Sequence, residues 1–317
     1  MKLGILGTAD VALRRFLPAL QSCQAFQYAG VATRGGDRAA TFREAFGGRV
    51  YDGYAALLED PEIEAVYIPL PPALHFAWAK QALSAGKHVL LEKPFTVSAR
   101  ETRELLELAA AQDLAVHENY MFLFHSQLRD IKARIASGEL GDLRLLRMSF
   151  GFPRRSAEDF RYDPDLGGGA LLDCGGYPVR LALELLGDDL RVTEARLSRE
   201  GGIDLYGSAV LEGGGLCAQI AFGMDNAYQC ALEVWGSRVT LTAPRVFTAG
   251  AGVTPELILR SSTDTATVTL PEDDHFRHSI DRFAALIEDP ALRPGANGKI
   301  MRQAELIDDI RNMGGCL

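Results

Sequence analysis

Residues 2–12, KLGILGTADVA, join a short apolar run to a turn and to the start of an amphipathic pattern. Gly7, Ala9 and Ala12 occupy the small positions of the pattern G-x-G-x-x-G/A. There the first residue permits a tight turn, the second lets the backbone approach a pyrophosphate, and the third allows close helix–strand packing. The N–H groups at the helix start would bind the anion. The stretch therefore predicts a dinucleotide-binding loop, with a purely structural turn as the alternative.

Short apolar strands and amphipathic helices alternate through the first 118 residues. We expect strands at 2–6, 27–33, 64–68, 88–91 and 114–117, and helices at 10–21, 37–46, 53–58, 74–85 and 98–111. Such alternation with short loops is typical of a doubly wound parallel sheet. The pattern predicts an N-terminal Rossmann domain over residues 1–118.

After about residue 118, strand-like runs follow one another without helices between them. We expect helices at 124–137 and 170–186, strands at 143–152, 191–200, 204–211, 216–223, 228–235, 238–243, 257–262 and 266–270, and closing helices near 275–288 and 297–312. Sequential strands of this kind indicate an open antiparallel sheet. The pattern predicts an α+β substrate and oligomerisation domain over 119–317, whose last helix can pack back on the first domain.

Composition narrows the class of protein. The chain has 317 residues, enough for two domains, and a net charge of −9 with both signs interspersed, so nucleic acid is not an expected partner. Five cysteines lie far apart, and no His, Asp or Glu cluster has metal-ligand spacing, so neither a metal site nor a disulfide framework is expected. No apolar run reaches the roughly 18 residues of a membrane helix, and no cleavage signal is visible. We expect a cytoplasmic protein with no membrane partner.

The end of the second strand indicates which dinucleotide is bound. A site for NAD places Asp or Glu there, to hold the ribose hydroxyls. This strand ends in Thr33 and Arg34, with Arg38 one turn into the next helix, while the nearest acid, Asp37, lies past the strand end. Because guanidinium groups pair phosphate oxygens, the sequence favours NADP(H) over NAD(H). The alternative is that both arginines are ordinary surface residues.

Three side chains could assist the reduction of a carbonyl group by a nicotinamide cofactor. Lys93 lies in Glu92-Lys93-Pro94, directly after the apolar run 87–91, and so at the carboxyl end of a predicted parallel strand. Asp173 and Tyr177 are four residues apart in the next domain's first long apolar helix, where Pro178 should introduce a bend. A lysine can hold a substrate oxygen, and a tyrosine hydroxyl near an ammonium group becomes a better acid–base group.

Each of these residues has a plainer interpretation. Lys93 could be a surface lysine beside a turn, Tyr177 a half-buried core residue and Asp173 a helix cap. His75, which follows Pro69-Leu70-Pro71-Pro72, could contact the cofactor or cap a helix.

Several motifs together resemble the glucose–fructose oxidoreductase and inositol dehydrogenase family, called Gfo/Idh/MocA. The resemblance covers nearly the whole chain and includes the Gly7 loop, Thr33-Arg34, Tyr67-Ile68-Pro69-Leu70-Pro71, Glu92-Lys93-Pro94, Glu118-Asn119-Tyr120-Met121-Phe122 and Gly167-Gly168-Gly169-Ala170-Leu171-Leu172-Asp173. It implies that Lys93 lies beside the nicotinamide and the substrate, and that Asp173 and Tyr177 are its catalytic partners.

From these motifs we expect a cofactor site made of Gly7, Thr8, Ala9, Asp10, Val11, Thr33, Arg34, Arg38, Pro69, Leu70, His75, Glu92, Lys93, Asn119 and Arg161. We expect substrate contacts from Met121, Phe160 and Tyr162, and no metal.

A narrower resemblance is to the nucleotide-hexose 3-ketoreductases. The segments that carry it are Glu118 to Phe122, His125-Ser126-Gln127, Phe160-Arg161-Tyr162, Phe222-Gly223-Met224 and Glu233-Val234-Trp235-Gly236. The family pattern has a proline where this chain has Ala249 or Gly250, in a loop that lines the expected substrate site.

This resemblance implies an NADPH-dependent reduction of a keto group on a sugar or nucleotide-sugar. The alternatives are a dehydrogenase of a free sugar or cyclic trans-dihydrodiol, and a non-catalytic NADP-binding sensor. We expect a homodimer or homotetramer that forms through the C-terminal sheet.

Overall fold

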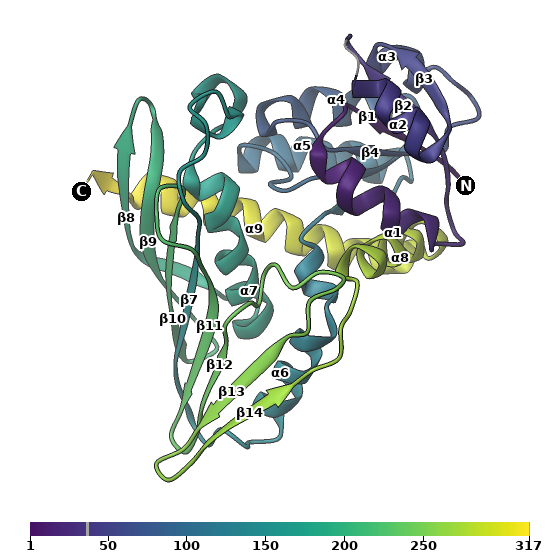
Figure 1. The fold of residues 1–317 in the computed structure, drawn as a ribbon. Coiled ribbons are helices and arrows are strands. Elements are labelled where there is room, and N and C mark those ends of the chain that lie inside the picture. Colours follow the sequence, from purple (N-terminus) through teal and green to yellow (C-terminus); the bar gives the residue numbers. More distant parts are fainter. Residues whose placement is uncertain (36–37, 317) are drawn as a thin grey trace. The chain divides into compact units, whose positions relative to one another are not determined.

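The computed structural model describes residues 1–35 and 38–316, which form two compact units. Unit 1 contains Met1–Asn119 and Phe276–Met301, and unit 2 contains Tyr120–His275 and the chain from Arg302 onward. The chain therefore leaves unit 1, builds most of unit 2, returns to unit 1 and ends in unit 2. Figure 1 draws the elements of both units.

Unit 1 is built on a parallel sheet, as the alternating pattern predicted. Its strands are β1 (Lys2–Leu6), β2 (Gln27–Thr33), β3 (Arg49–Asp52), β4 (Ala65–Ile68), β5 (His88–Leu91) and β6 (Val116–Glu118). They lie in the order β3-β2-β1-β4-β5-β6 with every pairing parallel. This is the strand order of a dinucleotide-binding Rossmann sheet, with its switch point between β1 and β4.

Helices connect these strands. They are η1 (Ala12–Phe16) with α1 (Leu17–Gln21), α2 (Arg38–Phe46), α3 (Tyr54–Leu58), α4 (Pro72–Ser84) and α5 (Ala99–Ala111). The turn η1 is a π-turn inside the first helix, where Phe16 stacks on the Tyr67 ring with centroids 3.8 Å apart. Ser98 caps α5 by accepting a hydrogen bond from the Glu101 N–H.

The edge strand β3 was not predicted from the sequence. Its four residues, RVYD, lack an apolar run, because three of the side chains are exposed and Tyr51 alone is buried. The strand pairs with β2 at Gly30, where a side chain would meet the Arg49 carbonyl oxygen at 2.2 Å. A close approach between backbones, rather than hydrophobic alternation, therefore permits this pairing.

The expected second domain, 119–317, needs a correction, because residues 276–301 belong to unit 1. This segment contains α8 (His275–Glu288), the turn η6 (Pro290–Leu292) and the start of α9 (Arg293–Met313). On α8, the Phe283 ring stacks on Phe26 at 5.5 Å. On α9, Arg293 donates to the Asp113 carboxylate at 2.6 Å. Unit 1 therefore includes most of α8 and the start of α9, and not only part of the last helix.

Unit 2 contains a nine-stranded sheet in the order β14-β13-β12-β11-β7-β10-β9-β8-β15. The strands are β7 (Leu143–Gly151), β8 (Arg191–Glu200), β9 (Ile203–Gly213), β10 (Leu216–Gly223), β11 (Gln229–Gly236), β12 (Thr240–Ala243), β13 (Glu256–Arg260), β14 (Thr265–Thr269) and β15 (Gly315–Cys316). Most pairings are antiparallel, but β7–β10 and β8–β15 are parallel. The predicted antiparallel sheet is therefore mixed, because a helix and two strands separate β7 from β10 along the chain.

One face of this sheet carries helix α7 (Gly176–Leu186), as Figure 1 shows. The π-turn η5 (Leu171–Gly175) precedes α7, and α6 (Ser126–Ala136) follows the short helix η2 (Met121–Phe124). The helix changes from π to α between Asp173 and Tyr177, which is where Pro178 predicted a bend. Such π-turns occur frequently at functional sites.

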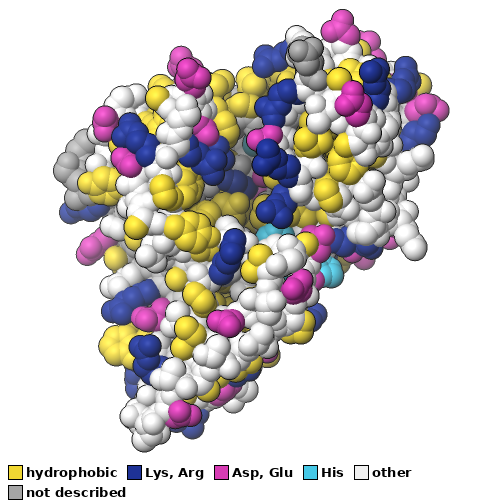
Figure 2. All heavy atoms as spheres, in the orientation of Figure 1, with side chains coloured by type: hydrophobic (Ala, Val, Ile, Leu, Met, Phe, Trp, Pro, Cys, Tyr) yellow, Lys and Arg dark blue, Asp and Glu magenta, His cyan; other side chains and the backbone are white. Residues whose placement is uncertain are grey.

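The surface carries both signs of charge. Figure 2 shows basic and acidic side chains intermixed over the face that it draws. Among the helices of the described residues, none combines the length and apolar character that crossing a membrane requires.

Candidate active site

The phosphate loop begins at Gly7, at the carboxyl end of β1. Gly7 has a φ of +98°, and a side chain there would meet the Leu70 Cδ2 atom at 2.7 Å. Its N–H donates to the Ala32 carbonyl at 2.9 Å, which ties the turn to β2. Only glycine suits this conformation and this approach. The loop therefore has the small residue and the helix start that a pyrophosphate site requires.

Arg34 lies beside this loop. Its guanidinium carbon is 5.5 Å from the centre of the Tyr54 ring, and the Tyr54 hydroxyl is 3.6 Å from where a Gly7 side chain would be. Arg38 instead forms an exposed ion pair with Asp10, so these two predicted cofactor residues contact each other. Thr33 accepts a hydrogen bond from the Gly35 N–H at 3.3 Å and so shapes the turn. Asp37 lies outside the described residues.

The loop that carries Lys93 is held by buried groups on neighbouring strands. The Glu92 carboxylate accepts hydrogen bonds from the Tyr67 hydroxyl and the Asn119 amide, each at 2.6 Å. Beyond Lys93, the Phe95 N–H donates to the Glu118 carboxylate at 2.8 Å. Side chains at the ends of β4 and β6 thus fix the backbone on both sides of Lys93.

Glu92 is a buried carboxyl group, 8 % exposed. Burial raises its pKa, while the Tyr67 and Asn119 hydrogen bonds and the charge of Lys93 lower it. Each of these contacts donates a hydrogen bond to the carboxylate or adds a positive charge near it. They offset part of the effect of burial, which is the largest and keeps the pKa of Glu92 above its ordinary value.

His75 adds a further connection in this region. Its ring nitrogens lie 2.8 Å from the Pro94 carbonyl oxygen and 2.7 Å from the Leu70 carbonyl oxygen. Burial lowers the pKa of His75 to about 4, so the ring is neutral and donates to one of these oxygens at a time. His75 therefore connects the loop after β4, which contains Leu70, to the loop after β5, which contains Pro94, and does not cap a helix.

In unit 2, Asp173 is paired with an arginine. The Arg161 Nε donates to Asp173 at 2.7 Å, and its NH1 group donates to Asp159 at 3.0 Å. Although burial lowers the pKa of Arg161, the Asp173 and Asp159 carboxylates raise it overall. Arg161, predicted to bind the cofactor, is therefore bonded to the predicted catalytic aspartate.

The glycine triplet 167–169 lets this loop close on the helix. A side chain at Gly168 would meet the Arg161 carbonyl oxygen at 2.5 Å, and one at Gly169 would meet the Asp204 carboxylate at 2.6 Å. Asp204 accepts the Leu171 N–H at 2.5 Å and so caps the helix that carries Asp173 and Tyr177. No local motif marks Asp204, because it comes from β9.

The Tyr177 ring lies among four aromatic rings and is 7 % exposed. Its centroid is 4.8 Å from Phe150, 5.2 Å from Tyr120, 5.7 Å from Phe122 and 5.8 Å from Phe247. Each such pair contributes about 0.5–1.5 kcal/mol beyond the area it buries. The cluster fixes the ring, so the hydroxyl has a defined direction.

The hydroxyl group of Tyr120 is hydrogen-bonded to a side chain of α9. The Gln303 amide donates to the Gly176 carbonyl at 2.9 Å and to the Tyr120 hydroxyl at 3.3 Å. A side chain at Gly176 would meet that hydroxyl at 2.1 Å. Gln303 was not predicted, because it lies 127 residues beyond Gly176 in the sequence.

The predicted substrate residues have different surroundings. Met121 is buried in η2, and Phe160 lies under the Arg161 guanidinium at 4.5 Å. The Tyr162 hydroxyl accepts the Arg155 N–H at 2.9 Å and donates to the Met224 carbonyl at 3.1 Å. Tyr162 thus has a structural role in its loop. Within the described chain, no group of three His, Cys, Asp or Glu residues could hold a metal.

Comparison with known families gives matches to both parts of the chain. Residues 1–120 match the model of an oxidoreductase family with an NAD-binding Rossmann fold, named GFO_IDH_MocA. Residues 128–242 match the GFO/IDH/MocA C-terminal domain.

Two curated relatives cover nearly all of the chain. A dTDP-3,4-didehydro-2,6-dideoxy-alpha-D-glucose 3-reductase of Streptomyces violaceoruber is 42% identical over 98% of this chain and 94% of its own length. A D-xylose 1-dehydrogenase (NADP(+)) of Haloferax volcanii is 32% identical over 100% of this chain and 99% of its own length.

A solved structure is also similar over the whole chain. It is KijD10, a 3-ketoreductase from Actinomadura kijaniata in complex with NADP and TDP-benzene, with 38% identity, a TM-score of 0.97 and coverage of 100% of this chain and 98% of that one. Variants of KijD10 with one lysine or one tyrosine replaced have also been solved. That lysine and that tyrosine are 84 positions apart, as Lys93 and Tyr177 are here.

The Arg161 pairing predicts a large effect of its loss. Arg161→Met should lower the free energy of unfolding by about 3 kcal/mol, because the largely buried Asp173 and Asp159 carboxylates lose their partner. The control is Arg154→Met in the same loop, whose pair with Asp225 is half-exposed and should contribute less than about 1 kcal/mol. Urea unfolding measures both, and equal losses in the two variants would contradict this assignment.

Proposed function

The chain belongs to the Gfo/Idh/MocA oxidoreductase family, and on that basis we propose that it uses NADPH to reduce the C3 ketone of a nucleotide-linked deoxy-sugar. The observation that carries the proposal is the fixed position of the Lys93 loop at the carboxyl edge of the Rossmann sheet. Glu92 and Phe95, on either side of Lys93, bond to residues of other strands. Ligands of open α/β sheets bind at this edge.

The residues of the phosphate loop fit the cofactor. The turn at Gly7 and the start of the first helix would hold the pyrophosphate, and Arg34 would pair a 2′-phosphate. When bound, NADPH supplies the hydride that reduces the ketone carbon. Arg34 is the better candidate for cofactor selection, since Arg38 already has Asp10 as its partner.

The proposed chemistry assigns one role to each polar residue. The Lys93 ammonium group donates a hydrogen bond to the ketone oxygen and stabilises the negative charge that develops there. Tyr177 gives its proton to that oxygen, which completes the alcohol. Asp173, held by Arg161 at 2.7 Å, orients the substrate beside Tyr177.

The substrate class rests on the relatives. The Streptomyces relative is named for a dTDP-linked 3,4-didehydro-2,6-dideoxy sugar, and KijD10 was solved with TDP-benzene. A second candidate is oxidation of a free sugar with NADP, favoured by the Haloferax D-xylose dehydrogenase. The sensor interpretation has less support, because Lys93, Asp173 and Tyr177 are all present.

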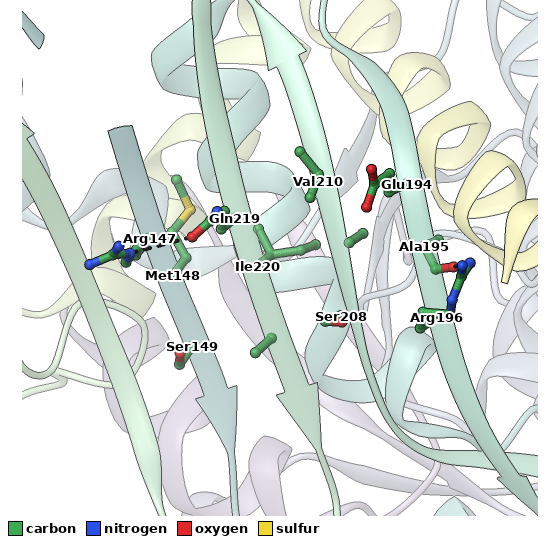
Figure 3. A pocket seen from close by; sticks show the side chains of 12 residues that line it. Arg147, Met148, Ser149, Glu194, Ala195, Arg196, Ser208, Val210, Gln219 and Ile220 are labelled. Carbon is green, nitrogen blue, oxygen red and sulfur yellow. Dashed lines mark hydrogen bonds between the residues drawn. The ribbon is translucent and has the colours of Figure 1, made fainter. Parts of the chain in front are cut away.

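We also propose that the solvent-exposed face of the unit 2 sheet packs against a second copy of the chain. Figure 3 shows a hollow there, lined by small or polar side chains such as Ser149, Ser208 and Gln219. Two aromatic residues of this sheet, Tyr206 and Trp235, are 45 % and 47 % exposed. The hollow carries Arg147, Arg196 and Glu194, so a two-fold partner can place opposite charges together.

Lys93→Met should abolish turnover while NADPH binding stays within about twofold, because the variant loses the charge that stabilises the ketone oxygen but keeps the phosphate loop. Loss of NADPH absorbance with dTDP-3,4-didehydro-2,6-dideoxy-glucose measures turnover, and fluorescence titration measures binding. Lys80→Met is the control, since Lys80 forms a surface pair with Glu104. Retained activity in Lys93→Met would refute the assignment. Oxidation of D-xylose by wild type, with no reduction of the keto-sugar, would favour the second candidate.

Arg34→Ala should raise the Kd for NADPH by about 10- to 100-fold and leave the Kd for NADH unchanged, since a charged hydrogen bond to phosphate contributes about 1.5–3 kcal/mol. Fluorescence titration with both cofactors measures the ratio. Arg43→Ala, an exposed arginine of α2, should change neither value. An equal loss of affinity for both cofactors would contradict the proposed phosphate contact.

Ala221→Arg should convert a dimeric or tetrameric protein to a monomer, because it places a long charged side chain in the exposed hollow of the sheet. Sedimentation velocity measures the mass of wild type and variant. Ser262→Arg, in the exposed turn after β13, serves as the control. A wild-type protein that stays monomeric at about 10 μM would contradict an interface at this face.

A further inference from the structure

A chain of buried side chains extends from the Lys93 loop to helix α8. The Tyr67 hydroxyl and the Asn119 amide donate to Glu92, and the Ser279 hydroxyl donates to the Asn119 amide oxygen at 2.8 Å. The His117 Nε2 lies 2.9 Å from the Ser279 oxygen. All five residues belong to unit 1, although Ser279 follows Asn119 by 160 positions.

Every member of this chain is shielded from solvent. Tyr67 and Ser279 are fully buried, and Asn119, His117 and Glu92 are 1 %, 6 % and 8 % exposed. A buried polar group that loses its partner costs about 1–3 kcal/mol. The connection to α8 therefore has a strong influence on where the Asn119 amide points.

The chemistry of the residues gives the hydrogen bonds one direction. An ionised Glu92 only accepts, so the Asn119 NH₂ group must face it and the Asn119 oxygen must face Ser279. Ser279 has one proton, which it donates to Asn119. The Ser279 oxygen then accepts from His117, which must carry its proton on Nε2.

We propose that Ser279 is a positioning residue, which acts through Asn119 to keep the Glu92 carboxylate ionised and directed at the Lys93 loop. This inference rests on the proposed catalytic role of Lys93. His117 completes the arrangement by supplying the hydrogen bond that leaves the Ser279 proton for Asn119. The segment that returns to unit 1 thus contributes to the site without contacting substrate or cofactor.

Removal of the Ser279 hydroxyl has a definite electrostatic consequence. The charged or titratable groups next to Glu92 are Tyr67 on β4 and Lys93 in its own loop, and Asn119 follows β6. Without Ser279 the Asn119 amide can rotate, and Glu92 then loses a donor. Because hydrogen bonds to the carboxylate lower the pKa of Glu92, their loss raises it.

Ser279→Ala should lower kcat by about tenfold and leave the KM for NADPH unchanged, because the Lys93 loop loses its orientation while the phosphate loop is untouched. The acid limb of the kcat profile should move to higher pH, as Glu92 becomes protonated more easily. Ser279→Thr, which keeps the hydroxyl, should restore both kcat and the position of the acid limb. Thr102→Val removes another buried hydroxyl of unit 1 and should leave the pH profile unchanged.

A double-mutant cycle separates positioning from general stability. In a Glu92→Gln background, Ser279→Ala should change kcat by less than about twofold, since the group through which it acts is already gone. An equal loss of kcat in both backgrounds, at every pH, would overturn the inference.

A measurement that needs no turnover distinguishes failure of this inference from failure of the proposed function. Burial raises the pKa of Glu92 above its ordinary 4.5, so ionisation of Glu92 opposes folding, and stability falls as pH rises through this window. Ser279→Ala should therefore destabilise more at about pH 8 than at about pH 4, where Glu92 is protonated in both states, and this difference should vanish with Glu92→Gln. If wild type reduces no keto-sugar, the proposed function fails, but the pH dependence of stability still tests the role of Ser279. An equal loss of stability at both pH values would overturn the inference about Ser279.

Discussion

The buried carboxylate of Glu92 is the constraint on which the Lys93 site depends. A carboxyl group shielded from water needs donors, and Tyr67 and Asn119 provide them from the strand ends on either side of β5. The parallel order of the sheet brings these residues together, since all strands end at the same edge. Glu118 and His75 then hold the backbone after Lys93. The loop is thus fixed by the sheet rather than by its own sequence.

Much of this architecture follows from local sequence. The apolar runs and the small residues from Gly7 to Ala12 predict the Rossmann unit, because each element depends on residues adjacent in the chain. Strand β3 cannot be predicted in this way, because its pairing with β2 depends on the absence of a side chain at Gly30. Local sequence also does not predict the mixed sheet or the return of residues 276–301 to unit 1. Both depend on contacts between segments far apart in the sequence.

The same division holds for the site residues. Lys93, Asp173 and Tyr177 can be found from motifs, because each stands in a recognisable local pattern. The residues that hold them come from distant segments: Asp204 caps the helix of unit 2, and Gln303 bonds to Tyr120. Arg161 lies close to Asp173 in the sequence, but its pairing with that carboxylate depends on the turns at Gly168 and Gly169. Motifs therefore identify the proposed catalytic groups, and the fold identifies the groups that hold them.

Transfer of deuterium from NADPH labelled at the nicotinamide C4 tests the central claim most directly. The proposed reaction places the hydride on the ketone carbon and a proton from the protein on its oxygen. With dTDP-3,4-didehydro-2,6-dideoxy-glucose as substrate, we predict one deuterium at C3 of the sugar product, observed by NMR. Label at C4, or a product without label, would contradict the account.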